Sequence, residues 1–248
     1  MFWAYLSPHF DDVALSCGGL AWQQSQLDEC VHLWTVCAAD PPRGGFSPFA
    51  EQLHARWETG CDAVAARRSE DIASCAILGA SYRHFSIPDC IYRTDANGVH
   101  LYASEAALFS AVHPAEDGLI EQMVAEIEAL LPEGANLVGP MGIGRHVDHR
   151  LTRAIAEGLA VRRVDVALWF YADFPYVLTQ PEQLRRLCHP QWESVRFDLP
   201  EAAVRAWVSG FVAHSSQLST FWPDADTAEA VFAAYTQLAG GARLWRVV

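Results

Sequence analysis

The chain has 248 residues, of which 51% are hydrophobic and 19% are charged, and this composition fits one α/β domain with a sizeable core. Its formal net charge of -13 argues against nucleic acid or an anionic membrane as a partner, because both require a basic surface. No apolar run reaches the roughly 20 residues that a membrane-spanning helix needs. All 17 basic residues are arginine, so chemistry that depends on a lysine side chain is excluded.

The seven cysteines are scattered along the chain, and no two of them have Cys-x-x-Cys spacing. Most fall inside apolar stretches, which is typical of buried free thiols in a reducing compartment. We do not expect a secretory leader, because Asp11 and Asp12 interrupt the first apolar stretch. The sequence therefore predicts a cytoplasmic protein, and it leaves association into a homo-oligomer open.

Apolar runs typical of buried strands alternate with stretches of helical pattern through most of the chain. This alternation predicts an α/β fold with a Rossmann-like, doubly wound and mostly parallel sheet. A turn-rich loop at 39–49 and an irregular insertion at 86–115 are expected to border the cleft and to set specificity. The expected strands are 2–6, 31–38, 82–85, 136–138 and 164–171, and the expected helices are 12–27, 50–57, 62–79, 117–131 and 146–160.

The pattern changes after residue 172. We interpret residues 1–172 as the catalytic core and residues 173–248 as a C-terminal α+β extension of a single domain, 1–248. Within the extension, the sequence predicts strands at 195–199 and 244–248 and helices at 200–212 and 227–238.

Three polar side chains, His9, Asp11 and Asp12, directly follow the first expected strand. Open α/β sheets place their functional sites at the carboxyl ends of strands. His9 and Asp12 are three positions apart, so one turn of the chain can direct both side chains at one point, with Asp11 beside it. Two cation ligands next to a free carboxylate suit metal-assisted hydrolysis.

A second motif runs from a strand through a glycine-rich loop into a helix at 137–149. His146 and His149 are three positions apart and share one face of that helix. If the two strands are neighbours, both motifs face one cleft, and a metal then has His9, Asp12 and His149 as ligands. Three such ligands leave a position open for water, as in catalytic zinc sites. Another divalent cation also suits this ligand set.

The motifs at 8–12 and 146–149 resemble those of the GlcNAc-PI de-N-acetylase (PIG-L or LmbE-like) family. Stretches at 67–70, 76–79 and 85–89 are also similar to the family pattern, so the resemblance covers roughly residues 2–172. It implies a zinc-dependent amidase that removes acetyl groups from N-acetylglucosamine-type sugars. The sequence departs from the family pattern at two positions, where Phe10 replaces the usual proline and Val13 replaces the usual glutamate.

The resemblance implies a role for each residue near the metal. Asp11 is expected to act as the general base that takes the proton of the attacking water. His146 is expected to stabilise the oxyanion together with zinc, while Asp148 orients His146 and favours its protonated form. Protonated Asp11 or protonated His146 would then deliver a proton to the departing amine.

Several further residues are expected around the substrate, which we take to be a small N-acetylated glycoside or sugar conjugate. By resemblance, Arg67 contacts hydroxyl or phosphate groups, and Asp89 accepts a hydrogen bond from a sugar hydroxyl. Asp40 follows the second expected strand and is therefore placed at the edge of the sheet that carries the site. His214 is expected to cap a helix or to line the pocket.

Three alternatives remain open at the level of the sequence. The first is another metal-dependent amide hydrolase, of the metallo-β-lactamase type, although Gly144 stands where that motif has its first histidine and the α/β pattern disagrees with its antiparallel sandwich. The second is a nucleotide-binding enzyme without a metal, which lacks support because no Gly-x-Gly-x-x-Gly follows the first strand. The third is a non-catalytic sugar-binding module on the same fold.

Overall fold

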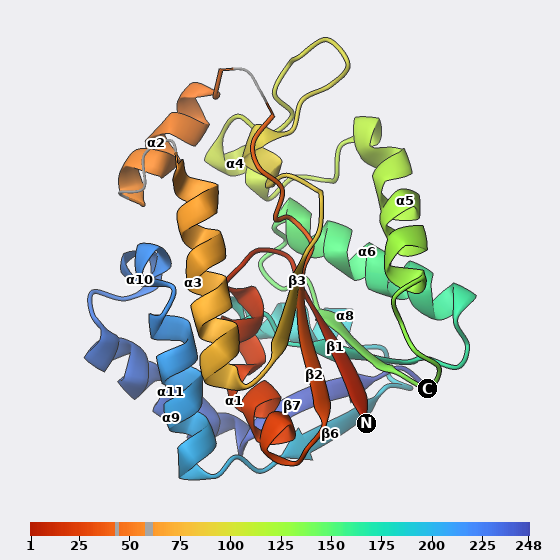
Figure 1. Cartoon of the computed structure of the whole chain (residues 1–248), viewed down its shortest axis with the longest axis vertical. Coiled ribbons are helices and arrows are strands. Elements are labelled where there is room, and N and C mark those ends of the chain that lie inside the picture. The colour runs from red at the N-terminus through yellow and green to blue at the C-terminus, as the bar shows by residue number, and fades with distance from the viewer. Residues whose placement is uncertain (43–44, 58–61) are drawn as a thin grey trace.

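The computed structural model describes residues 1–42, 45–57 and 62–248. Its centre is a seven-stranded sheet with the strand order β3-β2-β1-β4-β5-β7-β6 (Figure 1). The first five strands run parallel, whereas β7 is antiparallel to both β5 and β6. The strands are β1 (Phe2–Ser7), β2 (Cys30–Thr35), β3 (Ser81–His84), β4 (Asn136–Pro140), β5 (Ala167–Tyr171), β6 (Glu193–Phe197) and β7 (Ala242–Arg246).

The order of the first five strands is that of a doubly wound α/β sheet, so the predicted fold class is confirmed. The short helices α4, α7, α8 and α10 are not predicted by the sequence pattern, because four to seven residues carry too little helical period. The helices are α1 (Asp12–Gln26), α2 (Pro48–Arg56), α3 (Ala63–Leu78), α4 (Glu105–Leu108), α5 (Asp117–Glu128), α6 (Val147–Arg162), α7 (Tyr176–Thr179), α8 (Pro181–Leu187), α9 (Glu201–Val212), α10 (Ser215–Phe221) and α11 (Ala225–Ala239), with 3-10 turns at η2 (Cys90–Tyr92) and η3 (Pro114–Glu116).

The central strand β1 is buried on both faces by helices. Ala4 and Leu6 point into a core that includes side chains of α5 and α6. Trp3 and Tyr5 point the other way, into a core that includes side chains of α1 and α3. Figure 1 shows these two helical layers on either side of the sheet. Burial on both faces explains why this strand is a nearly continuous apolar run rather than an alternating one.

The sheet reverses its winding between β1 and β4. β1 pairs with β2 on one side and with β4 on the other, with Tyr5 opposite Val138. The chain connections from these two strands lead to helices on opposite faces, so the carboxyl ends of β1 and β4 leave a crevice between them. This is the topological switch point at which α/β proteins bind their ligands.

The C-terminal segment packs against the first helix of the chain. Helix α9 crosses α1 where Gly18 and Gly19 lie, and a Cβ at Gly19 would be 3.1 Å from Trp207 and 3.2 Å from the Ala203 carbonyl oxygen. The indole Nε1 of Trp207 donates a hydrogen bond to the Ala14 carbonyl at 2.7 Å. The two glycines thus permit the close backbone approach that their position inside a helix predicts.

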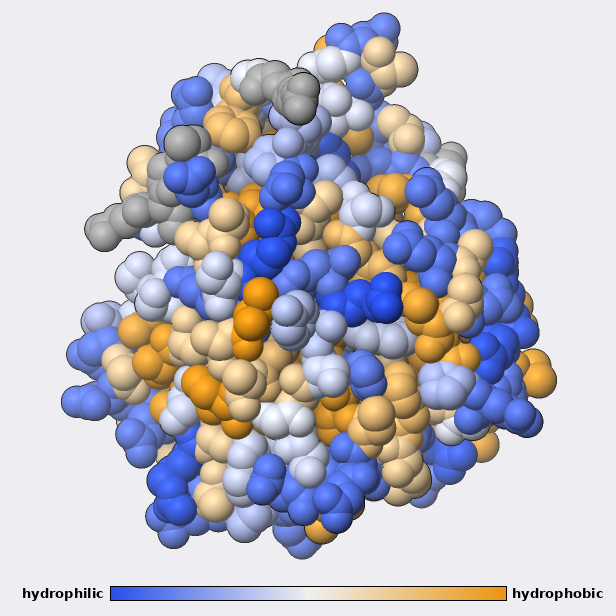
Figure 2. Space-filling view, in the orientation of Figure 1, coloured by the Kyte–Doolittle hydropathy of each residue, from blue (hydrophilic) through white to orange (hydrophobic). Residues whose placement is uncertain are grey.

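The surface of the molecule is mixed in polarity. Figure 2 shows hydrophilic and hydrophobic side chains interspersed on the face that carries β3, with hydrophilic residues over the outer side of α5 and the end of α6. No helix in the described ranges has both the length and the apolarity to cross a membrane. Residues 43 and 44 of the expected 39–49 loop, and Cys61 among the cysteines, lie outside the described residues, and the other six cysteines are free thiols.

Candidate metal centre and active site

Two loops that follow the neighbouring strands β1 and β4 build the candidate site. The segment after β1 provides His9, Asp11 and Asp12, and the loop after β4 ends at the cap of α6. Together they border a pocket of about 230 Å³. The polar residues that line it are His9, Asp11, Asp12, Arg56, Arg67, Asp89, Glu105, His146, His149, Gln217 and Thr220, and the other lining residues are mostly aromatic or aliphatic.

The His9 imidazole is held between two carboxylates. Its Nδ1 lies 3.1 Å from Asp12 Oδ2, and its Nε2 lies 2.9 Å from Asp148 Oδ2. Asp148 is fully buried, and its position is fixed by the Cys90 backbone N–H at 3.1 Å and by the Arg93 guanidinium at 2.6 Å. One nitrogen of His9 is therefore anchored by a buried aspartate, and the other faces Asp12.

The His149 imidazole has the same arrangement. Its Nδ1 lies 2.7 Å from Asp173 Oδ1, and its Nε2 lies 3.3 Å from Asp12 Oδ1. Asp173 is buried and accepts a second hydrogen bond from the Ile143 backbone N–H at 2.8 Å. Asp12 thus lies between two histidines, each of which directs one ring nitrogen at it and has the other nitrogen fixed by a carboxylate.

These residues fit a divalent cation. Histidines that ligate a metal donate their second ring nitrogen to a carboxylate or carbonyl, which fixes tautomer and orientation, and both His9 and His149 have such a partner. Burial alone would lower the pKa of His149, but Asp12 and Asp173 outweigh it and raise the pKa to about 10. The carboxylates around His149 therefore favour a positive charge at this point. The ligand atoms of His9, His146 and His149 also lie within 4.8 Å of one another.

A buried charge network lies beside this centre. The Arg67 guanidinium is 3.0 Å from Asp11 Oδ1 and 3.6 Å from Asp89 Oδ2, and it lies over the ring of Trp57, 4.9 Å from the centroid. Phe10, at the position where the family pattern has proline, is buried with its ring 5.8 Å from the same guanidinium. Arg67 and Asp89 therefore both border the pocket, and Arg67 also fixes the orientation of Asp11.

His146 is the residue before α6, and its Nδ1 accepts a hydrogen bond from the Asp148 backbone N–H at 3.3 Å. Burial, with a smaller contribution from the neighbouring His9, lowers the pKa of His146 to about 3. The imidazole is therefore neutral. Because Nδ1 accepts a hydrogen bond, the proton resides on Nε2, which makes that nitrogen a donor.

Two residues expected at the site have different surroundings from those predicted. The Asp148 carboxylate contacts His9 and Arg93, whereas only its backbone N–H reaches the His146 ring. Asp40 is not among the described residues that line the pocket. Its carboxylate is 75% exposed and pairs with Arg68 at 2.8 Å, because β2 ends at Thr35 and the chain has turned outward five residues later.

His214 lies behind the pocket rather than in its lining. It is fully buried at the start of α10, and neither ring nitrogen has a hydrogen-bond partner among the described residues. Burial lowers its pKa. The two serines that follow it, Ser215 and Ser216, bind the Glu70 carboxylate of α3 at 2.7 to 2.8 Å, so this turn attaches α10 to the helix that carries Arg67.

Two functional residues were not predicted from the sequence: Asp173, the carboxylate partner of His149, and Arg93, which fixes Asp148, the carboxylate partner of His9. Asp173 comes two residues after β5, at the same sheet edge as the two motifs, and that position was the available signal. Arg93 lies in the 86–115 segment, whose pattern gives no indication of where the chain runs.

A doubly wound sheet with a candidate histidine–aspartate cation site at its switch point, and the further carboxylate of Asp11 beside that site, places this chain in the class of α/β proteins with a candidate metal centre. The sequence profile of one family in this class, GlcNAc-PI de-N-acetylase (PIG-L), matches residues 4–160. The chain belongs to this family.

Individual relatives agree with this assignment. The chain is 34% identical over 179 residues to a 2'-N-acetylparomamine deacetylase of Streptomyces fradiae, and 30% identical over 187 residues to one of Niallia circulans. Each match covers 69% of this chain, but only 56% and 66% of the respective relative, so the chain spans less than two thirds of their length. The fold is similar throughout to a zinc-inhibited form of the teicoplanin deacetylase Orf2, with a TM-score of 0.84, 24% identity, and coverage of 100% of this chain and 98% of that one.

Proposed function

We propose that this protein is a metal-dependent N-deacetylase that hydrolyses the acetamide of an N-acetylglucosamine-type sugar conjugate. The observation that carries the proposal is the placement of Asp12 between two histidines, each backed by a buried aspartate, with Asp11 beside them. Membership of the PIG-L family and the sugar-deacetylase relatives support the same reaction class.

His9, Asp12 and His149 are the proposed ligands, and zinc is the proposed metal, although other divalent cations accept the same donors. When bound, zinc supplies Lewis-acid polarisation of an amide carbonyl and lowers the pKa of water towards about 7. The residues of the chain hold the ligands in place: Asp148 fixes His9, and Asp173 fixes His149. Both contacts keep the free ring nitrogens directed at Asp12.

Asp11 is the proposed general base. Its carboxylate borders the pocket and is oriented by Arg67 at 3.0 Å, so it can accept the proton of the water that attacks the acetamide carbon. Neutral His146 is the proposed oxyanion donor, because its Nε2–H is the free donor on a ring whose Nδ1 already accepts a hydrogen bond. Protonated Asp11 then returns the proton to the amine as the carbon–nitrogen bond breaks, which yields acetate and the free amino sugar.

The lining of the pocket supports a sugar that carries a large apolar group. Aromatic side chains surround the polar centre, and flat apolar rings stack on the faces of sugars and aglycones. Arg67 and Asp89 are the proposed contacts of the sugar hydroxyls. The lining aromatic residues are Phe49, Trp57, Phe109, Phe174, Tyr176 and Phe221.

The test combines metal analysis with amine release. Purified protein is measured for zinc by mass spectrometry, and amine release is followed from N-acetylglucosamine, 2'-N-acetylparomamine and an N-acetylglucosaminyl glycopeptide, with and without a chelator. We expect about one zinc per chain and chelator-sensitive release from at least one conjugate. Metal without release from any member would move the proposal to other amide substrates, and failure to bind zinc even after its addition would leave a sugar-binding module.

Matched variants separate the proposed roles. Asp11→Asn is expected to retain zinc and to lose turnover by at least about 100-fold, because general-base catalysis contributes 10²–10⁴. His149→Ala is expected to lose zinc. Asp40→Asn, which alters an exposed carboxylate outside the pocket lining, is the control and should retain both properties. Loss of zinc in the Asp11 variant would refute the division between base and ligand.

A further inference from the structure

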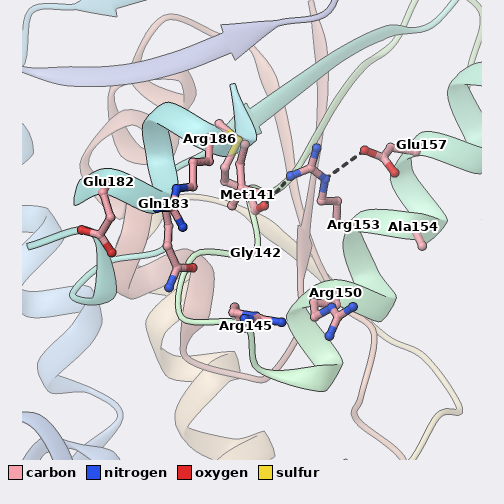
Figure 3. A pocket seen from close by; sticks show the side chains of 11 residues that line it. Met141, Gly142, Arg145, Arg150, Arg153, Ala154, Glu157, Glu182, Gln183 and Arg186 are labelled. Atoms are coloured by element: carbon pink, nitrogen blue, oxygen red, sulfur yellow. Dashed lines mark hydrogen bonds and ion pairs between the residues drawn. The ribbon is translucent and has the colours of Figure 1, made fainter. Parts of the chain in front are cut away.

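A second pocket, of about 450 Å³, lies between α6 and α8 and shares no lining residue with the candidate metal centre. Figure 3 shows arginine side chains entering it from the loop before α6, from α6 itself and from α8 on the opposite side. This concentration is unusual in a chain with a net charge of -13 and 17 basic residues. The four arginines of the pocket are Arg145, Arg150, Arg153 and Arg186.

Two of the four guanidinium groups have partners within the protein. Arg153 donates to Glu157 at 2.9 Å and to the Met141 carbonyl at 2.8 Å, and it packs over the Phe170 ring at 5.1 Å. Arg150 donates to the Ser110 carbonyl at 2.7 Å. These contacts hold the side chains of Arg150 and Arg153 against the protein.

The other two guanidinium groups, those of Arg145 and Arg186, have no side-chain hydrogen bond or ion pair within the described residues. Both side chains are exposed at the rim of the pocket. The two carboxylates of the lining belong to Glu157, which pairs with Arg153, and to Glu182. Four cationic groups against two anionic groups leave the pocket lining with an excess of positive charge.

The backbone beneath Arg145 is held in an unusual conformation. Its φ is 68°, in the left-handed region that residues with a Cβ rarely adopt. The preceding residue, Gly144, donates its backbone N–H to Gln183 Oε1 of α8 at 3.1 Å. The following residue, His146, lines the metal centre. The loop therefore presents Arg145 to one pocket and His146 to the other. Helix α8 is hydrogen-bonded to the same loop at Gly144, the residue before Arg145.

We propose that this second pocket is a binding site for a compact phosphorylated anion, held by Arg145 and Arg186 with Arg150 beside them. Guanidinium groups bind phosphoryl oxygens through paired, charge-assisted hydrogen bonds. The pocket has the volume of a small-molecule site. Because this pocket shares no lining residue with the candidate metal centre, the anion that it binds is distinct from the deacetylase substrate. The anion is either inorganic phosphate or a small phosphate ester.

Binding is tested on metal-stripped protein, so that no phosphate can associate with a metal. Inorganic phosphate, pyrophosphate and glucose 6-phosphate are titrated by calorimetry at low ionic strength. We expect saturable binding of at least one probe, and comparison of the inorganic probes with the ester separates the two sources. A double variant, Arg145→Asn with Arg186→Gln, is expected to bind at least about 100-fold more weakly, with about tenfold lost for each charged contact.

The control is Arg205→Gln, which removes an exposed arginine that pairs with Glu201 on α9. This variant should bind all probes as the parent does. Equal weakening in the control would show that net charge alone causes binding and would overturn the proposal, as would the absence of saturable binding of every probe. Circular dichroism of the double variant must match that of the parent. Because the readout requires neither zinc nor turnover, its failure is distinct from failure of the deacetylase proposal.

Discussion

Replacing Asp173 by asparagine tests the support of the proposed metal ligands. The substitution keeps the size of the side chain but removes its charge and one of its two acceptor oxygens. In the structure, one oxygen accepts from His149 Nδ1 at 2.7 Å and the other from the Ile143 N–H at 2.8 Å. The asparagine can serve only one of these donors, and its amide group then faces the other.

The magnitude follows from the lost contact. A hydrogen bond to a charged group contributes about 1.5–3 kcal/mol, and about 1.4 kcal/mol corresponds to tenfold in affinity. Residues that fix a ligating histidine typically change metal affinity by about 10–100-fold, which agrees with that energy. We therefore expect the zinc dissociation constant of Asp173→Asn to rise by about 10–100-fold.

The assay is competition for zinc with a chromophoric chelator at constant pH, with circular dichroism to check the fold. The matched control is Asp224→Asn, which makes the same chemical change at the exposed cap of α11, where the carboxylate accepts from the Thr227 N–H at 2.8 Å. Zinc affinity of the control should equal that of the parent. A well-folded Asp173→Asn protein with zinc affinity within about threefold of the parent would refute the reasoning.

Three further substitutions probe the surroundings of the site. Arg93→Leu leaves the fully buried Asp148 carboxylate without its cation, so the free energy of unfolding in urea should fall by about 3–5 kcal/mol; an unchanged transition would contradict the pairing. Gly144→Ala would place a Cβ 2.7 Å from Tyr176 Cγ, at a residue whose φ is 88°. We expect the free energy of unfolding to fall by about 1–3 kcal/mol and turnover to become slower. Turnover at the parent rate would show that the loop accommodates the added methyl group. Glu70→Ala removes three hydrogen bonds to the serines that begin α10. The free energy of unfolding in urea should fall by about 1–3 kcal/mol. An unchanged unfolding transition would show that these hydrogen bonds do not stabilise the fold.

The parallel part of the fold was predictable because its central strands, β1 and β4, are largely apolar and buried and its helices are long enough to show their period. Strand ends were less predictable. The expected strand 31–38 ends as β2 at Thr35, although Val36, Cys37 and Ala38 are also buried. An apolar run indicates which residues are buried, but it does not indicate at which residue the strand's backbone hydrogen bonding ends. The direction of β7 depends on which strand it reaches, and no local pattern encodes that.

The core of the site was predictable because two motifs follow neighbouring strands. His9 and His149 each have a second polar side chain three positions away, Asp12 and His146 respectively. This spacing indicates a candidate metal site in each motif without knowledge of the fold. The partners that orient them could not be inferred in this way. Asp173 is a single aspartate without a spaced neighbour, and Arg93 reaches Asp148 across 55 positions of sequence through a segment of irregular structure.

The antiparallel pairing of β7 with β5 has a consequence for the order of folding during synthesis. β5 ends two residues before Asp173, and its outer edge is paired by residues 244–246 of β7. Until that late segment leaves the ribosome, β5 presents an open edge, which is the kind of surface on which incomplete chains associate. We therefore expect nascent chains to contain Asp173 and both candidate metal-binding motifs before the outer edge of β5 is paired.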